Sequence, residues 1–189
     1  FYQAHTKLQS HKYIKMKLVI DVETNNFLDK LDTVHCIVCK DIETGKVYEF
    51  NPDNLEQGLQ LIKKATLLIG HSILGFDIQA LNKVFGKKFE YEGAVLDTLL
   101  CSRLIFSNRT ELDFKYKQLP PKLYGRHSIE AWGYRLGLRK GNFKEENTFD
   151  VWSQDMTDYC KRDVEVTYLL YKLIEAENYS KDAIKLEHQ

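Results

Sequence analysis

The stretch KLVIDVE at residues 17–23 constrains the fold more than any other part of the sequence, because it combines a buried-strand pattern with two neighbouring carboxylates. The apolar run at 18–20 favours a strand, and Asp21 and Glu23 follow it with one residue between them. Side chains alternate along a strand, so the two carboxylates share a face, about 6.6 Å apart along the backbone. Two negative charges this close resist ionisation unless a cation lies between them. The pattern therefore predicts a divalent metal site, with a strand that ends in solvent as the alternative.

Apolar periodicity along the rest of the chain predicts an α/β fold. Short apolar or alternating runs indicate strands, and apolar spacings of three and four residues indicate helices. We expect strands at 17–22, 34–40, 46–50, 65–70 and 91–97, a hairpin turn at 41–45, and helices at 54–64, 78–85, 99–104, 128–136 and 156–174. Three early strands followed by alternating helices and strands are typical of a mixed sheet.

Length and composition fit one domain, which we place at residues 16–178. The 189 residues, 43% of them hydrophobic, are enough for a substantial core. The sequence has no run of about 18 apolar residues, so we expect no membrane-spanning helix. Residues 1–15 lack the apolar core of a secretory signal and are expected to be a leader or an added extension, and 179–189 a C-terminal tail. A chain of this kind is expected in the cytoplasm.

The four cysteines, Cys36, Cys39, Cys101 and Cys160, are expected to be reduced. The CIVC spacing at 36–39 resembles half of a zinc site, but no second ligand pair follows at zinc-site spacing. Cysteine in a strand acts as a small hydrophobic residue, which is the better interpretation here.

Two further acidic positions stand where the fold would direct them inward. Asp77 follows the predicted strand that ends at Gly70 and opens a helix, either as its N-cap or as a functional acid. Tyr159 and Asp163 are four residues apart on the last helix and project from one face. The same face continues with apolar residues, Val166, Leu170 and Leu173, so Asp163 points inward and needs a partner. Four carboxylates can hold two divalent ions about 3.5–4 Å apart, the arrangement used for in-line attack on phosphodiesters.

Basic residues gather between Arg103 and Lys144. This segment has ten Lys and Arg against three Asp and Glu, in a chain that has 27 of each. Aromatic residues are interleaved with them, among them Tyr116, Tyr124, Trp132, Tyr134 and Phe143. Such a combination suits phosphates and unstacked bases, and a solvated helical surface with its aromatics in the core explains it equally well.

The order of the acidic motifs resembles the three exonuclease motifs of the DnaQ-like, DEDD-type 3′–5′ exonucleases. DVE at 21–23, FD at 76–77 and YCKRD at 159–163 correspond to them, and the tyrosine marks the tyrosine subtype. Longer blocks, LDTLLCSRLIFSN, GRHSIEAWGYRLGLRKGNF and DVWSQDMTDYCKRDV, are similar to the proofreading domain of the family-A DNA polymerases of T-seven-type podoviruses. The resemblance runs from about Met16 to Ile174. It implies an RNase H-like, DnaQ-type mixed five-stranded sheet flanked by helices.

The resemblance also implies a catalytic site with two divalent ions, Mg²⁺ or Mn²⁺. Asp21 would bridge both ions, and Glu23 and Asp163 would complete the protein ligands of the first. Asp77 would hold the second ion, largely through water. Tyr159 would orient the attacking water.

Substrate positions carry over in the same way. Thr24 and Asn25, just after the first motif, would lie beside the terminal nucleotide, and Phe76 would wall its pocket. The family's asparagine, five positions before the second-motif aspartate, is replaced by Ser72, a shorter side chain for gripping substrate. We interpret His71, before it, as a structural histidine at a strand end rather than a ligand.

The implied activity is a metal-dependent 3′–5′ exodeoxyribonuclease that hydrolyses the 3′-terminal phosphodiester of single-stranded or frayed DNA and releases nucleoside 5′-monophosphates. Its partner would be a DNA polymerase, in the same full-length chain or as a separate subunit, in the cytoplasm of a bacterial host if a phage encodes it. One alternative is a 3′–5′ exoribonuclease, which would differ in its contact with the 2′-hydroxyl. Another is a catalytically silent module that binds single strands or docks a polymerase, although silent members are expected to lose ligands and all four acids are present.

Overall fold

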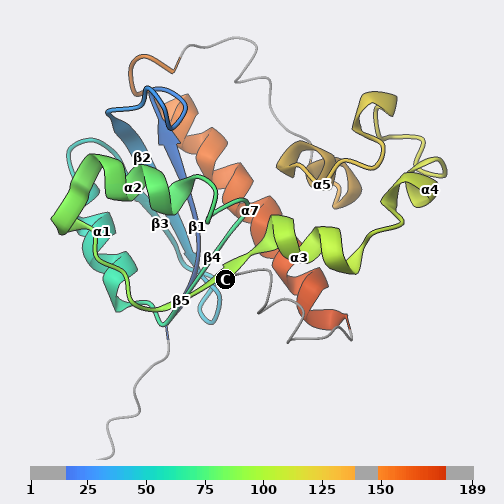
Figure 1. The fold of residues 1–189 in the computed structure, drawn as a ribbon, viewed down its shortest axis with the longest axis horizontal. Helices are drawn as coiled ribbons and strands as arrows, with labels where there is room; N and C mark the ends of the chain where they lie inside the picture. Colours follow the sequence, from blue (N-terminus) through green and yellow to red (C-terminus); the bar gives the residue numbers. More distant parts are fainter. Residues whose placement is uncertain (1–15, 139–148, 178–189) are drawn as a thin grey trace, which may run out of the picture.

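The structure is a computed structural model that describes residues 16–138 and 149–177 (Figure 1). The predicted leader at 1–15 and tail at 179–189 lie outside the described residues, as does the basic stretch at 139–148. A five-stranded mixed sheet forms the centre, with the strand order β3-β2-β1-β4-β5. The strands are β1 (Lys17–Thr24), β2 (Val34–Asp41), β3 (Val47–Phe50), β4 (Leu67–Gly70) and β5 (Ala94–Asp97). The predicted mixed sheet is confirmed.

Strand pairing leaves the carboxyl half of β1 without a neighbour on one side. β1 pairs antiparallel with β2 over most of its length, and β2 pairs antiparallel with β3. β4 lies parallel to β1 and β5, but its register with β1 ends at Val19 opposite Ile69. β4 is shorter than predicted because Ala65 still belongs to the preceding helix end, where its N–H donates to the Ile62 carbonyl.

All five predicted helices are present. They are α1 (Leu55–Lys64), α2 (Asp77–Phe85), α3 (Thr98–Ile105), α5 (Ile129–Arg135) and α7 (Gln154–Ala176). Three short elements were not predicted, because pieces this short show no apolar period: η1 (Gly86–Lys88), α4 (Arg109–Asp113) and η2 (Pro121–Leu123). None of the helices in the described ranges is long and apolar enough to cross a membrane.

Alternating side chains of β1 divide the molecule into two layers. Leu18, Ile20 and Val22 pack into the core that includes residues of α1 and α2. Val19 faces the other way, into a core formed with Cys160 and other residues of α7. Each large apolar side chain buried in this way stabilises the fold by about 1.5–3 kcal/mol. The strand register is therefore fixed, because a slip by one residue would turn all of them to the wrong face.

The segment from α3 to α5, residues 98–138, forms a lobe beyond α7, which we call the α3–α5 lobe (Figure 1). Trp132 is 1% exposed and packs against Val166 and Leu170 of α7. Asp113 is fully buried and accepts hydrogen bonds from Arg135 Nε (3.0 Å) and Nη2 (2.6 Å). Of the aromatic residues interleaved with basic charge, Trp132 is therefore a core residue.

Candidate active site

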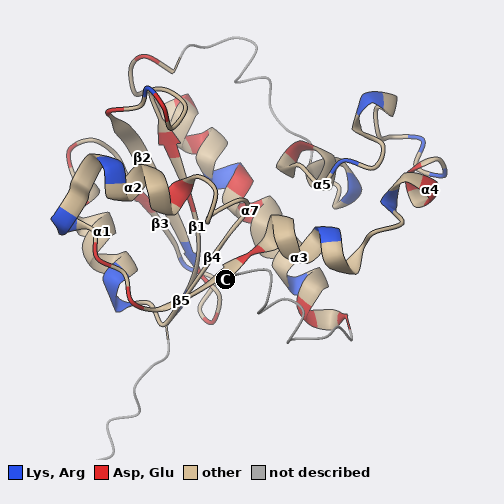
Figure 2. Ribbon diagram, in the orientation of Figure 1, with Lys and Arg blue, Asp and Glu red and all other residues tan. Residues whose placement is uncertain are grey.

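The two carboxylates of β1 lie on the sheet face that α7 covers. Val22 between them is 4% exposed and points into the opposite core, so Asp21 and Glu23 share a face as predicted. Both are half-buried, and their oxygens and the Cys160 Sγ lie within 4.8 Å of one another. Figure 2 shows acidic residues on the carboxyl end of β1 and on the nearby turns of α7.

Cys160 is the thiol of this cluster, and its Sγ is engaged with the backbone. Its thiol is fully buried and donates to the backbone carbonyl of Asp21 (Sγ to O, 3.3 Å). Burial above all, together with a hydrogen bond to Cys36 and the charge of Asp21, raises the pKa of the Cys160 thiol well above its usual range. A thiol held in its protonated form is a poor metal ligand, since metals bind the thiolate. The hard donors in this cluster are Asp21 and Glu23.

Asp77 reaches the same strand end from α2. Its Oδ1 accepts the Val22 N–H (3.1 Å), on a part of β1 that lies beyond the last residue paired with β4. The side chain is 3% exposed, and burial, followed by the charge of Asp21, holds the pKa of Asp77 well above its usual range. The N-cap alternative is not supported, because α2 begins at Asp77 itself and its N-cap residue, Phe76, makes no side-chain cap.

Tyr159 and Asp163 point inward from α7, as their spacing predicted. They are 3% and 7% exposed, and the Tyr159 hydroxyl is hydrogen-bonded to Asp163. Burial, followed by the charges of Asp163, Glu23 and Asp21, raises the pKa of Tyr159 far above its usual range. Tyr159 is therefore a neutral hydroxyl donor beside the carboxylates. The structure thus brings the first and third motifs together.

Asp97, at the end of β5, organises the loop that carries the second motif, and sequence reasoning did not select it. Its Oδ1 accepts from Ser72 N (3.0 Å) and Leu99 N (2.9 Å), and its Oδ2 accepts from Leu74 N (3.3 Å). Oδ1 also lies 3.4 Å from Leu100 N, so the carboxylate caps α3. Asp97 is 2% exposed. An aspartate between a strand and a helix was the available signal, but it indicates only the cap.

The loop begins with a strained residue. Ser72 has φ of 65°, the left-handed region that glycine and asparagine tolerate best. His71 before it is fixed by Thr98, whose hydroxyl donates to the Gly70 carbonyl (3.2 Å) and accepts from His71 Nδ1 (3.0 Å). The predicted structural role of His71 agrees with this hydrogen bond. The asparagine that the family carries at the position of Ser72 would suit the backbone better than serine does.

The segment after the first motif is closed by Asn25. Its Oδ1 accepts from the backbone N–H of Asp32 and Thr33 (both 3.2 Å), and its Nδ2 donates to Asp32 Oδ1 (2.8 Å). Thr24 is 6% exposed. The loop that these bonds close displays Phe27, which is 79% exposed and which sequence reasoning did not select. Contact of Thr24 and Asn25 with a terminal nucleotide stays a prediction, and the Asn25 amide has an internal role.

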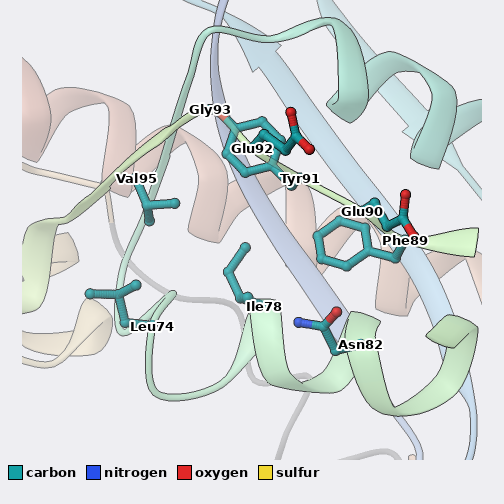
Figure 3. A pocket seen from close by; sticks show the side chains of 9 residues that line it. All are labelled: Leu74, Ile78, Asn82, Phe89, Glu90, Tyr91, Glu92, Gly93 and Val95. Atoms are coloured by element: carbon teal, nitrogen blue, oxygen red, sulfur yellow. The ribbon is translucent and has the colours of Figure 1, made fainter. Parts of the chain in front are cut away.

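Phe76 is half-buried and packs against the core that contains α1 and α2. A pocket of about 360 Å³ lies between α2 and the segment 89–95 (Figure 3). Leu74 and Ile78 line it together with residues from the segment 89–95, and no carboxylate of the four-acid set does. It is therefore separate from the acidic cluster.

This sheet order, with helices on both faces, is that of the RNase H-like fold of the DnaQ-like 3′–5′ exonucleases, which the chain resembles. Three of the solved structures that share the fold illustrate the likeness. The chain matches Brucella melitensis NrnC with bound Mg²⁺ with a TM-score of 0.59 and 18% identity, over 87% of this chain and 74% of that one. It matches Escherichia coli RNase D with a TM-score of 0.55 and 14% identity, over 91% of this chain and 43% of that one. It matches E. coli Exonuclease I in complex with a dT13 oligonucleotide with a TM-score of 0.57 and 12% identity, over 86% of this chain and 41% of that one.

Within this class the chain is homologous to phage DNA polymerases. It is 33% identical over 190 residues to the DNA-directed DNA polymerase of Enterobacteria phage T3 and 30% identical over 190 residues to that of Escherichia phage T7. Each match covers 86% of this chain and 27% of the polymerase, so the chain spans about a quarter of the length of these relatives. No protein-family profile matches the chain.

Proposed function

We propose that this chain is a 3′–5′ exonuclease that uses two divalent ions to hydrolyse the 3′-terminal phosphodiester of single-stranded or frayed DNA, releasing nucleoside 5′-monophosphates. One observation carries the proposal: carboxylates from three distant segments converge on the carboxyl end of β1. Asp21 and Glu23 have oxygens within 4.8 Å of each other, and Asp77 is bonded to the residue between them. Asp163 is hydrogen-bonded to Tyr159, whose hydroxyl is near enough to Glu23 and Asp21 for their charges to raise its pKa.

The residues present fit divalent cations. Carboxylate oxygens are the ligands that Mg²⁺ and Mn²⁺ prefer. Burial, followed by the charge of Asp21, raises the pKa of Asp77, and a cation bound beside these acids would favour their charged forms. We assign the four acids as the metal ligands: Asp21, Glu23 and Asp163 would hold the first ion, and Asp21 and Asp77 would hold the second. When bound, such ions lower the pKa of a water and stabilise charge on the leaving oxygen.

The chain's own groups would position the reactants. Tyr159 is a neutral hydroxyl donor beside the carboxylates and would orient the attacking water. Phe27, exposed on the loop that follows the first motif, offers a ring on which a base can stack. Thr24, Ser72 and Phe76 lie on the chain segments that flank these groups and would contact the terminal nucleotide.

DNA is the proposed substrate because the relatives with 30% and 33% identity are DNA polymerases. We therefore propose that the chain proofreads for a phage-type polymerase, in the same polypeptide or as a separate subunit, in the cytoplasm of a bacterial host. E. coli RNase D shares the fold, which keeps an exoribonuclease as the rival activity.

The test is a 3′-end trimming assay on 5′-labelled single strands. Matched DNA and RNA oligonucleotides are incubated with Mg²⁺, Mn²⁺ or EDTA, and we expect stepwise shortening of the DNA only when a metal is present. The double variant Asp21→Ala with Glu23→Ala should abolish shortening while circular dichroism shows a folded chain. Undiminished cutting by this variant would rule out the site, and preferential cutting of RNA would favour the rival activity.

The matched control removes two other acids with the same spacing. Glu90 and Glu92 are exposed at the rim of the separate pocket, so Glu90→Ala with Glu92→Ala changes the net charge equally and should leave shortening unchanged. Added Mn²⁺ should raise the melting temperature of the wild type and of this control, because a ligand that binds the folded state stabilises it. The Asp21/Glu23 variant should lose that rise, which tests the metal site without reference to activity.

A further inference from the structure

The α3–α5 lobe carries the positive charge of the molecule. Residues 98–138 contain seven Lys and Arg against three Asp and Glu, a surplus of four in a chain whose formal charge is zero. The rest of the chain is therefore acidic by the same amount. A charge asymmetry of this kind indicates a polyanionic partner rather than a feature of folding.

The acids of the lobe do not neutralise its surface. Asp113 is buried and bound to Arg135, and Glu130 lies 4.0 Å from Lys122. Lys115 and Lys117 are exposed, and within the described ranges neither takes part in an ion pair. Their charges are available to a ligand.

Exposed apolar side chains alternate with these two lysines. Leu112, Phe114 and Tyr116 are 39%, 70% and 41% exposed, and with Lys115 and Lys117 they form what we call the aromatic–lysine patch. It occupies the end of α4 and the turn after it, on the far side of α5 from the sheet in Figure 2. A monomer rarely exposes large side chains together without a binding role.

Two rings of the patch are held by contacts within the lobe. The Phe114 and Tyr124 rings form a T-shaped contact with their centroids 5.3 Å apart. The Tyr116 hydroxyl donates to the Arg135 carbonyl (3.2 Å), on the residue whose guanidinium binds Asp113. An exposed ring that is already held by such contacts loses less conformational entropy on binding than a free one does.

We propose that the aromatic–lysine patch binds the single-stranded DNA that leads into the candidate active site, with Phe114 and Tyr116 stacking on bases and Lys115 and Lys117 contacting phosphates. The inference rests on the proposed function for the identity of the strand. A nucleic acid fits better than a protein surface, because lysine is depleted where proteins meet and aromatic rings beside cations are the usual means of holding single strands.

The test compares long and short strands under conditions that prevent cutting. Fluorescence anisotropy in EDTA measures the Kd for deoxythymidine oligonucleotides of about 20 and about four nucleotides, since a single-strand site spans roughly 4–16 nucleotides. Phe114→Ala should weaken binding of the long strand about tenfold, the loss of one stacked base. Lys115→Gln with Lys117→Gln should lower the slope of log K against log salt by about 1.4, the value for two phosphate contacts on a single strand. Neither variant should change the affinity for the short strand.

Two further variants keep the result interpretable. Lys63→Gln with Lys64→Gln removes the same charge from exposed positions at the end of α1 and should leave the salt slope unchanged. Phe114→Trp keeps a stacking face and should restore binding, which a purely structural role would not predict. Long-strand affinity that matches the wild type in Phe114→Ala, or an equal loss in the α1 control, would overturn the proposal. Because binding is measured without metal, this outcome is independent of whether the chain cuts DNA, and cleavage of a short strand at the wild-type rate confirms an intact site.

Discussion

Replacing Asp97 tests whether the second motif is positioned by a residue outside it. Alanine would leave four backbone N–H groups without their acceptor: two at the start of α3 and two in the loop that leads to Asp77. Loss of the helix cap costs about 1 kcal/mol, and each loop hydrogen bond to a buried charged acceptor about 1.5–3 kcal/mol. The total of about 4 kcal/mol or more is a large part of the 5–15 kcal/mol that stabilises a domain of this kind. Asp97→Ala is therefore expected to be largely unfolded.

Asp97→Asn separates positioning from folding. Asparagine is as good a helix cap as aspartate, and its single oxygen can keep the bonds from Leu99 and Ser72. Its amide nitrogen cannot accept from Leu74 N, so about 2 kcal/mol should be lost and the chain should stay folded. With Leu74 released, the segment that ends in Asp77 is held less firmly. The Mg²⁺ concentration for half-maximal trimming should rise about tenfold, the effect typical of losing a group that orients a ligand.

Urea denaturation and a Mg²⁺ titration of the trimming assay measure the two effects. The stability control is Ser128→Ala, which removes the cap of α5 (Ser128 Oγ to Ala131 N, 3.3 Å) at a cost of about 1 kcal/mol and touches no part of the second-motif loop. Its metal requirement should equal that of the wild type. If Asp97→Asn loses stability and yet keeps the wild-type Mg²⁺ requirement, the carboxylate serves the fold alone and the positioning argument is refuted.

Three further changes probe single features of the structure. Tyr159→Phe should slow trimming less than loss of Asp21 does, because it removes a hydrogen-bond donor and no charge; equal damage in a single-turnover assay would mean that the role of the tyrosine is misassigned. Ser72→Asn should raise the free energy of unfolding by about 1 kcal/mol, since asparagine tolerates the left-handed φ of 65°, and a lower urea midpoint would contradict this. Burial, followed by the charge of Arg135, lowers the pKa of His127 to about 4, so its neutral form contributes stability above about pH 6.5 that is lost as the pH falls toward 4. His127→Gln should therefore flatten the fall in melting temperature across this range, and identical profiles would show that the imidazole is not kept neutral.

Alternation and helical spacing were sufficient to predict which way the acidic side chains of β1 and the Tyr159–Asp163 pair of α7 point. Asp21 and Glu23 share a face because of the strand period, and Tyr159 and Asp163 share one because of the helix period. These periods are local properties of the chain, so one sequence shows them. The separation of the two core layers followed from the same alternation.

The hydrogen bonds that hold the second-motif loop in place could not be predicted from these periods. Asp97 accepts hydrogen bonds from the backbone N–H groups of Leu74 and Ser72, which lie 23 and 25 positions earlier in the chain. Asn25 accepts from those of Asp32 and Thr33, seven and eight positions later. Every residue except proline has such a donor, so no side-chain pattern marks the partner. The aromatic residues interleaved in the lobe were ambiguous for a similar reason. Trp132 is buried because it packs against α7, which is distant in sequence, whereas Phe114 stays exposed although its ring contacts Tyr124.

The fold can hold mutually repelling carboxylates because the elements that carry them are fixed by packing elsewhere. Two unit charges about 4 Å apart repel by about 4 kcal/mol at an effective dielectric constant of 20. Burial of Leu18, Ile20 and Val22 on the other face of the same strand contributes about 1.5–3 kcal/mol for each side chain, which exceeds that repulsion. Burial, followed by the charge of Asp21, raises the pKa of Asp77, and packing keeps the acids in place despite their mutual repulsion. Binding of divalent cations would relieve this repulsion. The strand register that buries the apolar residues also places the carboxylates together, so the same register favours a positively charged ligand.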